Sequence, residues 1–91
     1  MSTAPMVQTT KIRKHKNGYY DVFVRCCYCD KIHGHGAGAE AGAIPPDAWP
    51  HDIMGQRLSH CKDMLQTGQY AISLHSWIAH GRKVTTLKKQ A

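Results

Sequence analysis

The chain has 91 residues, with 12 Lys and Arg, 6 Asp and Glu, 7 His and 4 Cys, and a formal net charge of +6. This length allows one domain with a small core, and a hydrophobic fraction of 42% excludes a collagen-like or fully disordered chain. No stretch approaches the roughly 18 apolar residues of a membrane span. We therefore expect a single soluble domain, without membrane contact, that uses cysteine or histidine to supplement its core.

The first sixteen residues, MSTAPMVQTTKIRKHK, contain no apolar segment typical of a secretory signal. We therefore expect a cytoplasmic, reducing location, where structural disulfides are rare. Cys26, Cys27 and Cys29 lie within four residues, and only Cys61 is distant, so at most one useful disulfide could form. This distribution favours metal binding over a disulfide framework.

A β-hairpin is predicted near the N-terminus, because Asn17-Gly18 is the preferred dipeptide of a two-residue turn. It separates Thr10–Lys16 from Tyr19–Arg25, a stretch rich in Tyr, Val and Phe. Residues 1–9 are expected to be a flexible terminus.

The predicted turn also sets a register for this hairpin. Lys14 would oppose Asp21 and Ile12 would oppose Phe23, which places a charge pair and an apolar pair on one face. The opposite face would carry Lys11, Arg13, His15, Tyr20, Val22 and Val24.

The domain is expected to span residues 10–86, interrupted by one long loop over residues 36–54. This loop is rich in Gly, Ala and Pro, and its glycine spacing matches neither the dinucleotide-binding nor the P-loop pattern. Residues 87–91 are expected to be a flexible basic C-terminus.

Two further strands are predicted, over Gln56–Cys61 and Gln69–His75, and the second places Tyr70, Ile72 and Leu74 on one side. The sequence after them fits two structures. It could form a last hairpin with a turn at Gly81-Arg82, or a short helix over Ser76–His80.

The most informative motif is Cys26-x2-Cys29-x3-His33-x-His35, followed after twenty-four residues by His60-Cys61. Two thiolates separated by two residues can hold one metal ion from a tight turn, and a distant pair can complete a tetrahedron. Cys26, Cys29 and Cys61 are the first three choices. The fourth ligand is left open among His33, His35 and His60. The expected architecture is a small, β-rich, zinc-stabilised domain of zinc-knuckle or treble-clef-like type with antiparallel hairpins. An α+β fold is the alternative.

Other Cys, His and Trp residues are interpreted more simply. Cys27 is predicted to point into the core, and Trp49 and Trp77 are predicted to be core or loop-anchoring residues. Surface positions are expected for His15, His51, His75 and His80.

The motif residues also carry a resemblance. The patterns CxYCxKxHxHG from Cys26 to Gly36, GxRxxHC from Gly55 to Cys61, and GxYxI from Gly68 to Ile72 resemble those of short Cys/His proteins of actinobacteria, their phages and some fungi. The usual proline after the first cysteine of that pattern is Cys27 here. The resemblance implies a zinc-stabilised module and no particular activity.

Positive charge is concentrated in the first and last parts of the chain. Residues 1–31 carry six basic and two acidic side chains, residues 32–66 two and four, and residues 67–91 four and none. The leading hypothesis is a zinc-binding module whose basic surface binds DNA or RNA. The residues expected to contact phosphates are Lys11, Arg13, Lys14, Lys16, Arg25, Arg82 and Lys83, with help from Lys88 and Lys89.

Two alternatives remain open. One is a protein-binding inhibitor or modulator of the phage or mobile-element type, which would bind a host protein. The other is a zinc-dependent hydrolase or nuclease, although no recognised metallohydrolase motif is present and no catalytic residue is assigned. A monomer or a small homo-oligomer is expected in each case.

Overall fold

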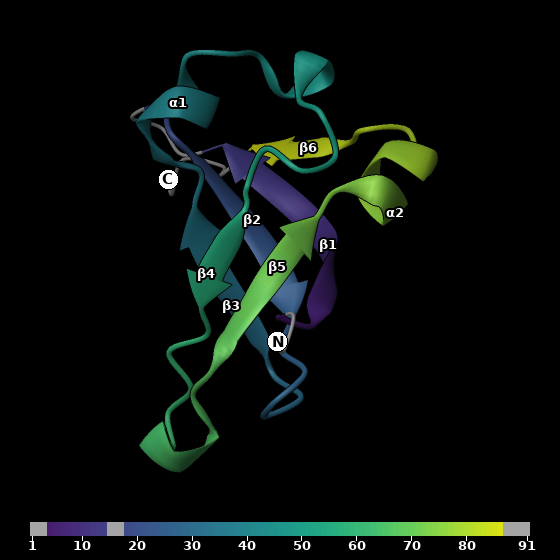
Figure 1. Cartoon of the computed structure of the whole chain (residues 1–91). Coiled ribbons are helices and arrows are strands. Elements are labelled where there is room, and N and C mark those ends of the chain that lie inside the picture. The colour runs from purple at the N-terminus through teal and green to yellow at the C-terminus, as the bar shows by residue number, and fades with distance from the viewer. Residues whose placement is uncertain (1–3, 15–17, 87–91) are drawn as a thin grey trace, which may run out of the picture.

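The computed structural model describes residues 4–14 and 18–86 of the chain (Figure 1). The strands are β1 (Met6–Lys14), β2 (Tyr20–Arg25), β3 (Ile32–Gly36), β4 (Gln56–Leu58), β5 (Gln69–Ser73) and β6 (Val84–Thr86). The helices are α1 (Gly38–Gly42), α2 (His75–Ala79) and the 3₁₀ turns η1 (Pro46–Ala48) and η2 (Met64–Gln66). None of the helices in these residues has the length and apolar character that a membrane crossing requires.

The strands of the described residues form one mixed sheet in the order β3-β2-β1-β5-β4, and β6 pairs with β1. The pairs β1–β2, β2–β3 and β4–β5 are antiparallel, whereas β1 pairs in parallel with both β5 and β6. The prediction of a small β-rich domain is confirmed. The expected antiparallel hairpins are present, and the parallel pairing of β1 with β5 and β6 is an addition that was not predicted.

The β1–β2 hairpin exists, but its predicted register is wrong by one residue. Ile12 pairs with Val22 and Lys14 pairs with Tyr20, so Ile12 does not oppose Phe23. A one-residue shift exchanges the two faces of a strand. The observed register places Ile12, Val22 and Val24 together in the core, and it leaves Lys11 and Arg13 on the outer face with Phe23. Burial of the three aliphatic side chains therefore decides the register. Asn17 of the predicted turn lies outside the described residues.

Strand β1 begins at Met6, so residues 6–9 belong to the sheet and not to a flexible terminus. Val7 and Thr9 are buried, and so is Ile12, which lies three positions further on. An irregularity in the β1–β2 pairing between Thr9 and Lys11 accounts for this break in the alternation. The first half of β1 pairs with β5, and the second half pairs with β6.

Residues 36–54 are not a single loop, because they contain α1 and η1 and are held around Trp49. The Trp49 indole N–H donates to the carbonyl oxygens of Ala41 at 3.0 Å and Ile44 at 2.8 Å. Tyr20 packs edge-on against the Trp49 ring, with ring centroids 5.7 Å apart. A fully buried indole thus gives this glycine- and proline-rich segment a fixed course.

The segment after β5 forms the helix α2 and then β6, so the predicted final hairpin is wrong and the helical alternative is confirmed. The helix ends where Gly81 adopts a φ of 93°. The N–H of Arg82 donates to Trp77 O, and that of Gly81 donates to Ile78 O, which are the bonds of a Schellman cap. The cap turns the chain so that β6 returns alongside β1.

The core lies between the curled sheet and the segments that carry the two tryptophans. Tyr70, Ile72 and Leu74 are buried, as the alternation over Gln69–His75 predicts. Figure 1 shows the β2–β3 and β4–β5 loops at one end of the molecule and α1 at the opposite end. The two halves of the Cys/His motif belong to the end with these two loops.

Candidate metal centre

The first half of the centre is a tight turn between β2 and β3. The N–H of Cys26 donates to Lys31 O at 2.8 Å, and the N–H of Asp30 donates to Cys26 O at 3.0 Å. Asp30 has a φ of 59°, a left-handed conformation that Asp tolerates better than most residues. The Tyr28 N–H points at the Cys26 sulfur at 3.3 Å. The turn therefore directs Cys26 and Cys29 toward the same point.

The second half of the centre comes from the loop that joins β4 to β5. Strand β4 ends at Leu58, three residues short of the predicted Cys61, and His60 takes a φ of 54°. This left-handed residue reverses the chain direction, so Cys61 points inward and is buried while His60 is exposed. His60 and Cys61 therefore point in different directions and do not bind the same metal ion. Neighbouring side chains of an extended strand diverge in the same way.

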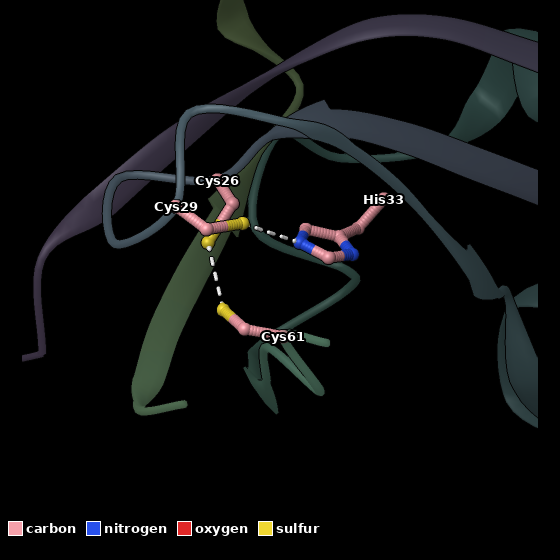
Figure 2. Close-up of side chains that lie close together, drawn as sticks. All are labelled: Cys26, Cys29, His33 and Cys61. Carbon is pink, nitrogen blue, oxygen red and sulfur yellow. Dashed lines mark hydrogen bonds between the residues drawn. The ribbon is translucent and has the colours of Figure 1, made fainter. Parts of the chain in front are cut away.

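Four ligand atoms converge at this point: the sulfurs of Cys26, Cys29 and Cys61 and a ring nitrogen of His33 (Figure 2). All lie within 4.8 Å of one another. The Cys26 and Cys61 sulfurs are 3.6 Å apart, and Nε2 of His33 lies 3.0 Å from the Cys29 sulfur. Cys26 and Cys61 are buried, and the other two are half-buried. The group can hold one metal ion.

The sulfur separation matches shared coordination and not a disulfide. A disulfide needs about 2.05 Å between sulfurs. Two thiolates on one tetrahedral zinc, at about 2.3 Å each, lie roughly 3.8 Å apart, close to the 3.6 Å between Cys26 and Cys61. Three sulfurs and one imidazole nitrogen are also a donor set that zinc prefers.

The electrostatics of the three thiols also favour a cation. Burial raises the pKa of Cys26, but hydrogen bonds from the N–H groups of Cys29 and Tyr28, aided by Cys61, lower that pKa by more. Burial raises the pKa of Cys29, and the neighbouring Cys26 thiolate adds to the increase. The surroundings therefore favour the thiolate form of Cys26, and a charge there opposes ionisation of Cys29. A divalent ion would remove that opposition.

The remaining candidate ligands lie elsewhere. His35 is also on β3, but its Nε2 is 2.5 Å from the Tyr70 hydroxyl, and burial, followed by the charge of His33, lowers its pKa. His60 is exposed and is not part of the group. Cys27 is exposed, so its predicted core position is wrong, because the tight turn sends Cys26 inward and its neighbour outward.

Three residues that the sequence interpretation did not select support the centre. Ser59 Oγ lies 3.2 Å from the Cys61 sulfur and accepts the Gly68 N–H at 3.0 Å. The Tyr28 hydroxyl donates to Gln69 O at 2.5 Å, and its ring covers Gly68, where an added Cβ would lie 2.7 Å from Tyr28 Cζ. Tyr28 and Gly68 thus join the two halves of the centre, and their place in the motif was the available signal.

Only some of the basic residues predicted to contact phosphates lie close together on one face. On the outer face of β1 and β2, the Lys11 ammonium and the Arg13 guanidinium lie 5.0 and 5.1 Å from the Phe23 ring centroid. Arg13 also pairs with Asp21 at 3.4 Å. On the other face of β1, Lys14 lies over Tyr20 at 6.0 Å.

The other predicted phosphate contacts are less uniform. Arg25 pairs with Asp30 at 3.4 Å on the surface. Arg82 has a structural role, because its guanidinium donates to Trp49 O at 3.2 Å and to Pro46 O at 3.4 Å. Lys83 is exposed just before β6. Lys16, Lys88 and Lys89 lie outside the described residues.

The tryptophan and histidine predictions can also be compared with the structure. Trp49 and Trp77 are buried, which confirms their predicted core role. His51, His75 and His80 are exposed, as expected, while His15 lies outside the described residues. The His51 and His75 rings lie against each other with centroids 4.2 Å apart and planes tilted by 57°.

Comparisons with family models, with curated proteins and with solved structures found no match to this chain. The resemblance to short Cys/His proteins of actinobacteria and their phages therefore stays a prediction.

Proposed function

We propose that this protein is a small zinc-binding module in which the metal is structural and a basic surface centred on β1 binds nucleic acid. The observation that carries the metal part is the convergence of Cys26, Cys29, His33 and Cys61 within 4.8 Å. Cys26 and Cys29 come from the β2–β3 turn, His33 from the start of β3 and Cys61 from the β4–β5 loop, so one ion would tie the β2–β3 hairpin to the β4–β5 hairpin. A zinc knuckle completed by a distant ligand would have this arrangement.

The number and type of ligands favour a structural over a catalytic zinc. A catalytic zinc usually has three protein ligands and an open position for water, whereas here four side chains converge. Three of the four are cysteines, which are typical of closed structural sites. A zinc hydrolase or nuclease is therefore the least favoured of the three candidate functions. Because the thiols must stay reduced, we place the protein in a reducing compartment.

The topology supports the nucleic-acid part. Strand β6 pairs with Ile12–Lys14 of β1, so the basic residues that lie early in the chain come next to Lys83. Lys11 and Arg13 flank the partly exposed Phe23 on the outer face of the sheet. Cations beside an aromatic ring are a common arrangement where proteins bind the phosphates and bases of single strands.

Binding of fluorescently labelled oligonucleotides, measured by anisotropy at increasing salt, tests the nucleic-acid part. We expect affinity to fall steeply, with a log–log slope of about −0.7 per phosphate contact on a single strand. Lys11→Gln should make the slope shallower by about one contact. Lys62→Gln is the matched control, because Lys62 is exposed in the β4–β5 loop, which lies at the end of the molecule away from β6 (Figure 1). No binding by the zinc-loaded protein, or a slope near zero, would refute this part of the proposal.

A second candidate function, a protein-binding module, is favoured by one observation. Met64 and Leu65 in η2, at the tip of the β4–β5 loop, are 86% and 96% exposed. Exposed apolar side chains that lie side by side are a feature of protein-contact surfaces. If the protein inhibits or modulates a host protein, Leu65→Ser should abolish capture of that protein from a host lysate. Oligonucleotide binding should then be unchanged.

A further inference from the structure

A pocket of about 340 Å³ lies beside β1, at the point where its parallel neighbour changes from β5 to β6. β5 pairs with Met6–Gln8 and β6 pairs with Ile12–Lys14, so residues 9–11 lie between the two paired stretches. The helix α2 and the segment leading into β6 complete the walls. The pocket is therefore a product of the split pairing of β1, and it is separate from the Cys/His centre.

The lining has the chemistry of an anion site. It includes Lys11, Lys83 and His80, which are cationic or can become so, and no carboxylate. The remaining lining residues are mostly uncharged hydrogen-bonding groups: Gln8, Thr9, Thr10, Ser76, Trp77 and Thr85. The His80 Nδ1 donates to Ser76 O at 2.6 Å, which holds the ring at the wall. Phosphate groups are bound in proteins by such combinations of cations and hydroxyl donors.

One buried group in this wall lacks a partner. Thr9 is only 2% exposed, and its hydroxyl makes no hydrogen bond within the described part of the chain. A buried hydroxyl without a partner costs about 1–3 kcal/mol. Valine would fill the same space without that cost, so a ligand or a water molecule that accepts a hydrogen bond from this hydroxyl would be favoured beside it.

We infer that this pocket binds a phosphate group, and that in the cell the group belongs to a nucleic-acid strand. The assignment of this phosphate to a nucleic-acid strand rests on the proposed function. Lys11 joins the two sites, because it lines the pocket and its ammonium lies 5.0 Å from the Phe23 ring centroid on the outer face of the sheet. A strand crossing Phe23 would place one phosphate in the pocket.

The pocket is tested directly by titrating inorganic phosphate into the ¹⁵N-labelled, zinc-loaded protein, with chloride at equal ionic strength as the reference. We expect saturable amide shifts confined to the pocket, at Thr9, Thr10, Lys11, Ser76 and Lys83. A 5′-mononucleotide should shift the same amides. If it binds no less tightly than an oligonucleotide, the natural ligand is a free nucleotide and the strand assignment is wrong. Shifts spread over all basic residues, or no saturable shift, would overturn the inference.

Two variants separate binding from folding. Thr9→Val should leave thermal stability unchanged or higher, because it removes an unpartnered hydroxyl, yet it should weaken phosphate binding about tenfold. Lys83→Gln should weaken it by a similar factor, and Lys62→Gln should not. Unaltered phosphate binding in both pocket variants would overturn the inference.

Failure of the inference and failure of the proposed function give different results. If the wild-type protein binds oligonucleotides and Lys83→Gln binds them as tightly as Lys62→Gln does, the pocket has no role and only the inference fails. If phosphate shifts the pocket amides but no oligonucleotide binds, the phosphate site stands, and the nucleic-acid function and the strand assignment are both wrong.

Discussion

The two ends of this molecule are held together by different interactions. At one end, the β2–β3 turn and the β4–β5 loop meet at Cys26, Cys29, His33 and Cys61. Across residues 59–68, only Ser59 and Cys61 are buried. At the other end, Trp49 and Trp77 are buried with ring centroids 6.3 Å apart, and hydrogen bonds to carbonyl oxygens hold both indoles.

This difference shows how a 91-residue chain can order two long connections with a small core. The loop at the metal end buries too little apolar surface to offset its conformational entropy, and in our proposal a metal ion supplies the missing stability. The segment at the tryptophan end has a large apolar side chain at its centre and needs no ion. Loss of metal should therefore affect the first end before the second.

The largest expected effect comes from replacing a ligand. Cys61→Ser should abolish zinc binding and lower the free energy of unfolding by several kcal/mol, because zinc binding energy is folding energy in such modules. Cys27→Ser is the matched control, since Cys27 is exposed and outside the ligand group. Elemental analysis and thermal unfolding check both variants. Equal zinc content in the two would contradict the assignment of Cys61.

The next largest effect should come from the tryptophan end. Trp49→Ala removes a fully buried indole and should destabilise the protein by about 3–5 kcal/mol. Zinc stoichiometry should stay the same wherever the variant is folded, because the Trp49 ring bonds to Ala41 and Ile44 and packs against Tyr20 and Trp77, none of which is a ligand residue. Chemical denaturation with parallel metal analysis would check this. Zinc loss under folding conditions would show that the two ends are not independent.

An intermediate effect is expected where the two halves of the metal end touch. Gly68→Ala should cost about 1–3 kcal/mol, because the new Cβ would lie 2.7 Å from Tyr28 Cζ. In combination with Tyr28→Ala, the cost of Gly68→Ala should largely disappear in a double-mutant cycle. Additive effects in urea denaturation would mean that the tyrosine does not pack on this glycine.

The smallest effect is expected at Arg82. Its guanidinium donates to two carbonyl oxygens of the Trp49 segment, so Arg82→Gln should destabilise the protein by about 1 kcal/mol. Oligonucleotide affinity should change less than in Lys11→Gln, because Arg82 acts inside the protein. An equal loss of affinity in the two variants would return Arg82 to the binding surface.

The sequence allowed prediction of the elements whose signals are local. Alternation predicted β5, the Asn-Gly dipeptide predicted the first hairpin, and C-x2-C spacing predicted the turn that carries Cys26 and Cys29. The preferred turn dipeptide does not set the register of that hairpin. The register is set by the common burial of Ile12 and Val22, which form a pair across the two strands. The parallel pairing of β6 with β1 is non-local and leaves no local signal.

The fourth ligand shows the same limit. His33 and His35 are two residues apart on β3, so both point to the same face, and spacing cannot separate them. Distance along the strand separates them: His33 lies near the turn, and His35 faces Tyr70. The irregularity of β1 beside the proposed pocket shows only in the burial of positions 7, 9 and 12, which breaks the period of two.

The most direct test of the account is native mass spectrometry of the purified protein, followed by amide spectra before and after chelation. We predict one zinc ion per chain. We further predict that chelation removes the dispersed signals of residues 26–33 and 59–68 before it moves the indole signals of Trp49 and Trp77. A chain that carries no zinc, or whose two loops keep their signals in excess chelator, would contradict the claim that a metal ion orders this end of the molecule.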